Sequence, residues 1–357
     1  MTLPGNSGKR ALALMTGLSL SLFALTGGAE PRFDPDDQES VAVLIDELVD
    51  RGIEREWLEQ AMRGANFEQG VLDAMEGAAE RRLRWDEYRE IFLQPERIER
   101  GAAFIVAHRD AFERAEAQYG VPAEIIAAII GVETSYGRFT GRHRVIDSLS
   151  TLAFHHPSRG TFFRGELAAF LEIAREQEVD PGTLNGSYAG AMGYPQFIPT
   201  SYRAYAVDFD GDGHRDLWTN PVDAIGSVGN YFAEHGWQPG EPIVDDASGP
   251  DALPDSIEFN ATRAPYVELG ELIAQGIEPA VEMTDEIQVM PLAFDYRLDS
   301  DVGNGEGELR YHYRLGHRNF YVITRYNHSH LYAMAVTELA EAIRAHYEDT
   351  QWPGEAT

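Results

Sequence analysis

Residues 122–137 (PAEIIAAIIGVETSYG) form the segment that most narrows the folds available to this chain. Proline suits the first turn of a helix. Ile126, Ile129 and Ile130 then recur at the spacing of one helix face. A helix with such an apolar face has to be covered by other elements, so we expect it to be buried within a helical domain.

Glu133 extends this apolar face by one further turn. Desolvation and the negative end of the helix dipole both disfavour an anion there, so we expect the pKa of the carboxyl group to be raised. A carboxylic acid that stays protonated near neutral pH can donate a proton to a leaving group. The alternative is that the helix frays at Gly131 and that Glu133 points into solvent.

The composition excludes several classes of function. The 357 residues carry a formal net charge of -30, which would repel a phosphate backbone and an anionic lipid surface. Nucleic acid is therefore not an expected partner. The chain has no cysteine, which excludes disulfides, thiolate catalysis, zinc sites built on thiolates and a lipid anchor on cysteine.

The first 29 residues have the pattern of an export signal. Lys9 and Arg10 precede an apolar run at 11–25, and small residues follow it at 26–29. The run is shorter than the roughly 20 residues that a membrane span needs. We expect an exported, periplasmic protein without a further transmembrane segment; an uncleaved signal anchor is the alternative.

Periodicity predicts a mainly α protein with a small β insertion. After a linker at 30–39, residues 40–99 are expected to form an N-terminal helical domain, and 100–240 the main helical core. Residues 241–318 are expected to form a small β-containing domain. Residues 319–357 are predicted to complete the core with a strand and a helix.

Within these regions we expect one long helix at 96–119 and a last helix at 331–347. Alternating patterns predict the strands, at 256–260, 287–290, 309–314 and 319–325.

Residues 208–219 match the first half of an EF-hand loop. Asp208, Asp210, Asp212 and Asp216 stand at positions 1, 3, 5 and 9, with Gly213 at position 6 and the His214 carbonyl at position 7. Position 12 is Thr219 instead of glutamate, and Asp223 is the expected substitute. Oxygen ligands at this spacing favour Ca²⁺, which we expect to be structural. The alternative is a solvated Asp/Gly turn.

A second motif, SYAGAMGYPQFIPTS, covers residues 187–201. Gly190 and Gly193 would let the backbone approach a ligand closely. Met192 could pack against a sugar face, and Gln196 offers both a donor and an acceptor. A tight structural loop is the alternative interpretation.

Three motifs together resemble one family. They are ETSYG at 133–137, the motif at 187–201 and RYNHS at 325–329, with the EF-hand-like loop between the second and the third. In this order they resemble the membrane-bound lytic murein transglycosylase B family (glycoside hydrolase family 103), here without the cysteine of a lipid anchor. The resemblance covers nearly the whole mature chain and implies a lysozyme-like catalytic core at 100–240.

The resemblance also implies a groove that binds peptidoglycan glycan strands, with no organic cofactor. Glu133 would first protonate the bond between N-acetylmuramic acid and N-acetylglucosamine, then act as a base to form a 1,6-anhydro product. Ser187 would orient the acetamido group, and Gln196 would hold Glu133 or the substrate. The implied cleft positions are Tyr88, Ser187, Gln196, Tyr231, Tyr326, Asn327 and Tyr332.

Ordinary glycosidases use two carboxylates. Asp147 is the nearest second candidate in the sequence, and no pattern supports it. The alternative functions are a lysozyme-type muramidase that hydrolyses the same bond, a non-catalytic calcium-stabilised peptidoglycan-binding module, and a calcium sensor. Protein partners are not predicted by any motif.

Overall fold

The computed structural model describes residues 32–78, 83–297 and 308–349. The predicted export signal at 1–29 lies outside the described residues. Residues from Arg32 onward form one compact unit. In the part of the chain that is described, no helix combines the length and the apolar character needed to cross a membrane.

Helix α7 lies at the centre of one group of helices. Its main neighbours are α5 (Pro95–Ala107), α6 (Arg109–Tyr119), α11 (Pro221–Glu234) and α14 (His330–Asp349). The helix itself spans Ala123–Thr134, and its residues 125–131 are all buried. The sequence predicted one buried face. The structure buries every side of this helix because neighbours pack all around it.

A second group of helices is built on the antiparallel pair of α8 (Val145–His155) and α9 (Gly160–Glu176). Helix α3 packs on α8, α1 packs on α9, and α2 packs on α1. Their bounds are Glu39–Asp50 for α1, Arg55–Arg63 for α2 and Gln69–Ala78 for α3. These contacts cross the predicted boundary between an N-terminal domain and the core; the boundary itself stays a prediction.

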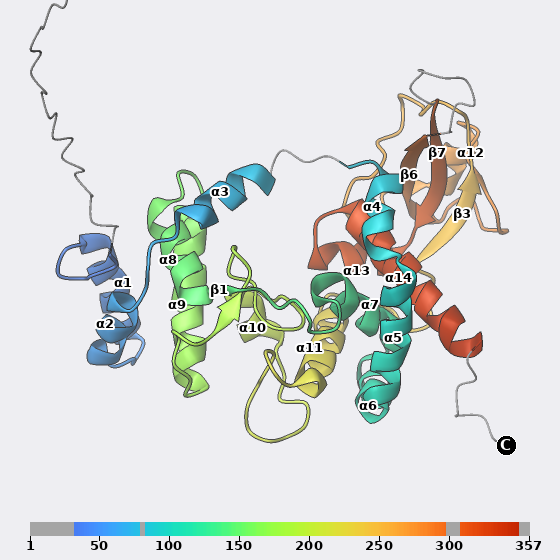
Figure 1. Ribbon diagram of the computed structural model, residues 1–357. Coiled ribbons are helices and arrows are strands. Elements are labelled where there is room, and N and C mark those ends of the chain that lie inside the picture. The colour runs from blue at the N-terminus through green and yellow to red at the C-terminus, as the bar shows by residue number, and fades with distance from the viewer. Residues whose placement is uncertain (1–31, 79–82, 298–307, 350–357) are drawn as a thin grey trace, which may run out of the picture. The chain divides into compact units, whose positions relative to one another are not determined.

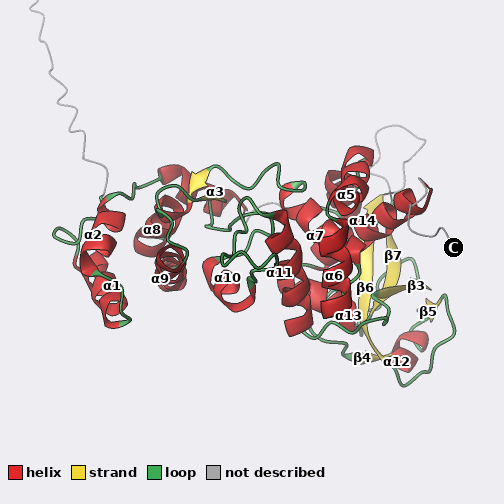
Figure 2. Ribbon diagram, turned by 90° about the horizontal axis from the view of Figure 1, so that it is seen from below, coloured by secondary structure: helices red, strands yellow, loops and turns green. Residues whose placement is uncertain are grey.

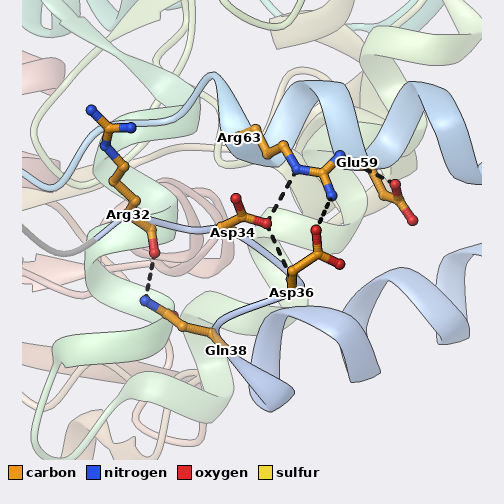
Figure 3. A network of polar contacts seen from close by, with 6 residues as sticks. All are labelled: Arg32, Asp34, Asp36, Gln38, Glu59 and Arg63. Atoms are coloured by element: carbon orange, nitrogen blue, oxygen red, sulfur yellow. Dashed lines mark hydrogen bonds and ion pairs between the residues drawn. The ribbon is translucent and has the colours of Figure 1, made fainter.

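The described chain begins with a short segment fastened to α2 (Figure 3). The Arg63 guanidinium lies 3.2 Å from the Asp34 carboxylate and 2.9 Å from that of Asp36. Phe33 is fully buried, and its ring lies 5.7 Å from that of Phe154 on α8. Exposed ion pairs contribute about 0–1 kcal/mol each, whereas burial of a phenyl side chain contributes about 1.5–3 kcal/mol, so Phe33 is the main anchor.

The β insertion is a five-stranded antiparallel sheet (Figure 2). Its strand order is β4-β6-β7-β3-β5, and the long pair β6/β7 runs in register from Met290 opposite Gly316 to Arg297 opposite Leu309. The strands are β3 (Val244–Ser248), β4 (Val267–Glu268), β5 (Glu278–Pro279), β6 (Gln288–Arg297) and β7 (Leu309–Gly316).

The two faces of this sheet are both covered. Val289 and Ala293 pack with the short helix α12 (Leu269–Ile273) in a small separate cluster. Met290, Leu292 and Phe294 belong instead to the main core, where β6 meets α4 (Trp85–Phe92). Successive side chains of β6 point to opposite faces of the sheet. One face packs on α12 and the other on the main helical core, so β6 connects the insertion to the helices.

Two predicted strands are absent from the described structure. Residues 319–325 lie in helix α13 (Arg318–Tyr326), which buries Phe320, Val322 and Ile323. A short apolar run does not distinguish a strand from a buried helix, which is why this prediction was wrong. Residues 256–260 have irregular backbone, and the Asn260 side chain exchanges two hydrogen bonds of 2.9 Å with the backbone of Ala293.

The predicted long helix at 96–119 is two helices, α5 and α6, that meet at His108. The backbone of His108 leaves the helical region there, with φ -123° and ψ 31°.

Candidate active site

Glu133 lies in the last turn of α7, and its side chain is half-buried. The Tyr332 hydroxyl donates a 2.6 Å hydrogen bond to Glu133 Oε1. Desolvation raises the pKa of Glu133 to about 7, against the opposing effect of the Tyr332 hydrogen bond. A carboxyl group with this pKa is protonated in about half of the molecules at neutral pH, so it can exchange a proton in either direction.

Three tyrosines from three different helices lie near enough to Glu133 for its charge to affect their pKa. They are Tyr88 of α4, Tyr326 of α13 and Tyr332 of α14. Burial, and secondarily the charge of Glu133, raises the pKa of Tyr88 to about 12 and those of Tyr326 and Tyr332 well above the ordinary value. These phenols therefore stay neutral. The Tyr332 hydroxyl donates to Glu133, whereas the Tyr326 hydroxyl donates to the Pro195 carbonyl at 2.6 Å.

The other cleft residues implied by the resemblance occupy different environments. Tyr231 is only 6% exposed, and its hydroxyl donates to the Arg325 carbonyl at 2.6 Å. Its ring packs edge-on against Tyr326, with 4.8 Å between the centroids. Tyr231 therefore packs beneath the surface against Tyr326 and does not line an open groove. Asn327 follows α13 and is exposed.

The chain leaves α7 through three consecutive residues with left-handed backbone. The φ angles are 50° at Ser135, 61° at Tyr136 and 81° at Gly137. The Thr134 hydroxyl oxygen accepts a hydrogen bond from the Gly137 N–H at 3.0 Å and lies 3.0 Å from the Tyr194 carbonyl oxygen. Such a turn is costly for residues other than glycine, and these hydrogen bonds hold it in place.

The helix does not fray at Gly131. The Tyr136 ring fits between Gly131 of α7 and Gly101 of α5, and its hydroxyl donates to the Arg97 carbonyl at 2.9 Å. A Cβ atom on Gly131 would lie 2.6 Å from the Tyr136 hydroxyl oxygen. This glycine thus makes room for an aromatic side chain, and the alternative of a frayed end with a solvent-facing Glu133 is wrong.

Residues 187–198 of the second motif form a tight loop, and residues 199–201 begin helix α10 (Pro199–Tyr205). The polar side chains of the loop bond mainly to the backbone. Ser187 Oγ accepts the N–H groups of Ala189 at 3.2 Å and Ala191 at 3.0 Å. Gln196 Nε2 donates to the carbonyls of Thr140 at 3.1 Å and Gly193 at 2.8 Å. The Gln196 amide nitrogen therefore holds this loop to the segment after Glu133, and not the Glu133 carboxylate itself.

Two expectations for this loop need correction. Met192 is fully buried in the core, so in this structure it cannot pack against a sugar. A Cβ atom on Gly193 would lie 2.1 Å from the Leu217 carbonyl oxygen, and one on Gly190 would lie 2.4 Å from Leu149. These glycines permit close packing within the protein, not a close approach to a ligand.

The EF-hand-like loop gathers three exposed carboxylates. Ligand oxygens of Asp208, Asp210 and Asp212 all lie within 4.8 Å of one another. Backbone N–H groups support them: that of Gly213 donates to Asp208 at 2.9 Å, and that of His214 donates to Asp212 at 2.8 Å.

Asp223 does not join this cluster. It is fully buried, and its two oxygens accept the N–H groups of Phe209 at 2.7 Å and Asp216 at 2.8 Å. Asp223 thus braces the loop from the start of α11 instead of replacing the position-12 ligand. The loop also contacts the second motif, because the Tyr194 N–H donates to the Leu217 carbonyl at 2.8 Å.

Asp147 is not a second carboxylate of the site. It is buried, with one oxygen accepting the Asn66 N–H at 2.8 Å and the other 3.2 Å from Arg144. The raised pKa of Glu133 comes from burial and receives no contribution from another acid. Among the described residues, Glu133 is therefore the single carboxyl group with the properties of an acid at this site.

His330 was not singled out from the sequence. It begins α14, two residues before Tyr332, and its ring lies 5.7 Å from Phe294. Burial lowers its pKa to about 4, so it is neutral at physiological pH. The one signal in the sequence is its position beside the third motif.

Comparisons with known proteins agree with this arrangement. Residues 36–341 match the model of the Transglycosylase SLT domain family. The chain is 43% identical over 311 residues to the membrane-bound lytic murein transglycosylase B of Escherichia coli (strain K12), which covers 84% of this chain and 81% of that protein.

Two solved structures are similar over most of the chain. The catenated lytic transglycosylase SltB1 from Pseudomonas aeruginosa is 48% identical, with a TM-score of 0.79, covering 88% of this chain and 100% of the other. The Escherichia coli lytic transglycosylase Slt35 in complex with calcium is 41% identical, with a TM-score of 0.77, covering 89% and 97%. These neighbours confirm the predicted class, mainly α with a lysozyme-like core and a small β insertion.

Proposed function

Because the chain belongs to the Transglycosylase SLT domain family and is a lytic murein transglycosylase acting on peptidoglycan, we propose that Glu133 is its acid and then its base. The observation that carries this proposal is the half-buried Glu133 carboxyl group, hydrogen-bonded to Tyr332 and with a pKa of about 7.

In the first step, protonated Glu133 donates its proton to the oxygen that links N-acetylmuramic acid to N-acetylglucosamine. The bond from C1 to that oxygen breaks, and the oxygen leaves as a hydroxyl group. The carboxylate left behind is stabilised by the Tyr332 hydroxyl, since a hydrogen bond to a charged acceptor is stronger than one to a neutral acceptor.

In the second step, anionic Glu133 removes the proton of the C6 hydroxyl of the same muramic acid residue. The freed oxygen bonds to C1 and closes a 1,6-anhydro ring, so that Glu133 regains its proton and no water is consumed. Ser187 would orient the acetamido group: its oxygen accepts two backbone N–H groups, which leaves the hydroxyl hydrogen available to donate.

The test of this proposal is Glu133→Gln, assayed on purified sacculi. General acid–base catalysis contributes about 10²- to 10⁴-fold, so turnover should fall by at least about 100-fold, with a melting temperature no lower than that of the wild type showing that the fold is intact. Turnover near the wild-type level would refute the role of Glu133.

The mass of the wild-type product tests the route. An anhydro product is lighter by one water than the reducing end that a lysozyme-type hydrolase would leave. A hydrated product from the wild-type enzyme would favour the hydrolase.

The EF-hand-like loop supports a second proposal, a structural calcium site. Asp208, Asp210 and Asp212 would supply carboxylate oxygens, and the His214 carbonyl would supply another. The donor set is oxygen only, which fits a hard cation. A bound ion would neutralise these carboxylates and steady the loop, which supports the second motif through Leu217 and Tyr194. No step of the reaction passes through it.

The site of action follows from the substrate. Peptidoglycan glycan strands are the proposed partner, and the periplasm is the proposed location. The export signal at 1–29 would bring the enzyme there, and retention of the first 29 residues in protein recovered from the cell would favour the signal anchor.

A further inference from the structure

The segment that follows the Glu133 turn has an unusual charge for this protein. Residues 138–144 (RFTGRHR) contain three arginines and no acid, in a chain with 59 acidic and 29 basic residues. Arg144 pairs with Asp147. Arg138 and Arg142 are exposed, and neither forms an ion pair with any residue that the structure describes. Because most of this surface repels anions, two unpaired guanidinium groups mark a place where an anionic ligand can bind.

The same segment lies between Glu133 and the second motif. On one side, the Phe139 N–H donates at 3.0 Å to the carbonyl of Thr134, which is the residue directly after Glu133. On the other side, Gln196 donates to the Thr140 carbonyl at 3.1 Å. Gly141 packs tightly against Gly186, the residue before Ser187: a Cβ atom on Gly141 would lie 1.9 Å from the Gly186 carbonyl oxygen. The segment is therefore fixed between the proposed acid and the residue proposed to orient the acetamido group.

The Phe139 ring in the same segment is strongly exposed. Its side chain is 68% exposed, more than any other large apolar side chain in the described part of the chain. The Arg138 guanidinium lies 5.7 Å from its ring centroid. Packing within the protein does not account for this ring, and an aromatic face of this kind suits the apolar C–H face of a sugar.

We propose that residues 138–142 bind the peptide-bearing N-acetylmuramic acid of the substrate. Phe139 packs against the sugar ring, and Arg138 and Arg142 pair with carboxylates of the stem peptide. This inference rests on the proposed function, since it gives the same site a preference among peptidoglycan strands. Guanidinium groups are well suited to carboxylates because they can donate two parallel hydrogen bonds.

The experiment compares two substrates with the full-length enzyme. One is glycan strands with intact stem peptides, and the other is the same strands after chemical amidation of their carboxylates. Two exposed pairs are each worth about 0.2–1 kcal/mol, so Arg138→Gln/Arg142→Gln should raise KM for the intact strands by about twofold to thirtyfold. We expect kcat to stay within about twofold and KM for the amidated strands to stay unchanged.

Two further variants sharpen the assignment. Phe139→Ala should raise KM for both substrates, and Phe139→Tyr should restore it, because a ring face is needed and a charge is not. Arg344→Gln is the matched control: Arg344 is exposed and pairs with Glu124, nine residues before Glu133 on α7. It removes the same charge and should leave both KM values unchanged.

Salt provides an independent measurement. KM of the wild type for intact strands should rise with ionic strength, and that rise should be smaller in the double variant, because exposed ion pairs are screened. The inference is overturned if the double variant and Arg344→Gln give the same KM on both substrates. That result would leave the proposed function intact, which fails only if Glu133→Gln keeps its turnover or the wild-type product is hydrated.

Discussion

The end of α7 and the EF-hand-like loop at 208–219 both contain carboxyl groups, and the two environments shift the pKa of these groups in opposite directions. At the end of α7, Glu133 is half-buried; partial desolvation raises its pKa to about 7, and the Tyr332 hydroxyl donates one hydrogen bond to it. In the loop, Asp208 is exposed, and the backbone N–H groups led by that of Gly213 lower its pKa. The first environment makes an acid that exchanges protons, and the second makes a permanent anion that suits a cation.

The pH dependence of stability gives the largest expected difference between the two regions. The folded pKa of Glu133 lies above its unfolded value, so the folded protein binds more protons. Its contribution to the free energy of unfolding is therefore complete below about pH 4.5 and is lost as pH rises to about 7. The loss amounts to roughly 3 kcal/mol.

Urea unfolding of the wild type and Glu133→Gln across this range measures that loss, and the amide variant should not show it. Parallel curves for the two proteins would mean that burial does not perturb Glu133. Asp208 has the opposite sign, because its folded pKa is lowered: its contribution is present above its unfolded pKa and is lost as pH falls.

Calcium should affect the loop and leave Glu133 alone. An ion that binds only the folded state at about 100 times its Kd stabilises it by roughly 2.7 kcal/mol, so calcium should raise the Tm. Asp212→Asn should abolish this increase, because it removes one of the three clustered carboxylates. Glu133→Gln serves as the control and should keep the full increase. Equal melting curves of the wild type with calcium and with a chelator would refute the metal site.

Removal of the Tyr332 hydroxyl should have a smaller effect, on the same carboxyl group. The Tyr332 hydrogen bond lowers the pKa of Glu133, so Tyr332→Phe should raise that pKa further. A hydrogen bond to a charged group is worth about 1.5–3 kcal/mol, which corresponds to roughly one to two pH units.

The first step needs protonated Glu133, so activity of the wild type should decline as pH rises through about 7, and this decline should move to higher pH in Tyr332→Phe. The pH profile of kcat/KM provides the measurement. An unmoved profile would show that another group controls the decline. Tyr231→Phe is a useful comparison, since its hydroxyl bonds to the Arg325 carbonyl and not to Glu133.

The sequence was most informative where one local pattern determines the structure. The spacing of the isoleucines predicted that Glu133 lies at the end of a buried helix, and Glu133 does lie in the last turn of the buried helix α7. The aspartates of the loop were also predictable, because the EF-hand pattern is contained within a few residues. Both predictions use short-range geometry, which the chain carries without knowledge of its neighbours.

Predictions that depended on long-range packing were less secure. Nothing local indicates that Met192 and Tyr231 face the interior while Tyr88 stays partly open. The same limit explains why residues 319–325 looked like a strand: their apolar spacing suits both elements, and the buried surroundings decide. Tyr326 and Tyr332 came from the family resemblance, since 199 residues separate Glu133 from Tyr332 in the sequence.

The Tyr136 ring held between Gly101 and Gly131 has a consequence for efforts to make this protein more heat-resistant. Helix glycines are ordinary first choices for replacement by alanine, which restricts the unfolded chain and favours the helix. Here an added methyl group at Gly101 or Gly131 would come within 2.5 or 2.6 Å of the Tyr136 hydroxyl oxygen. The tyrosine would have to move, and with it the turn that follows Glu133, so replacement by alanine at these two places should destabilise the protein instead of stabilising it.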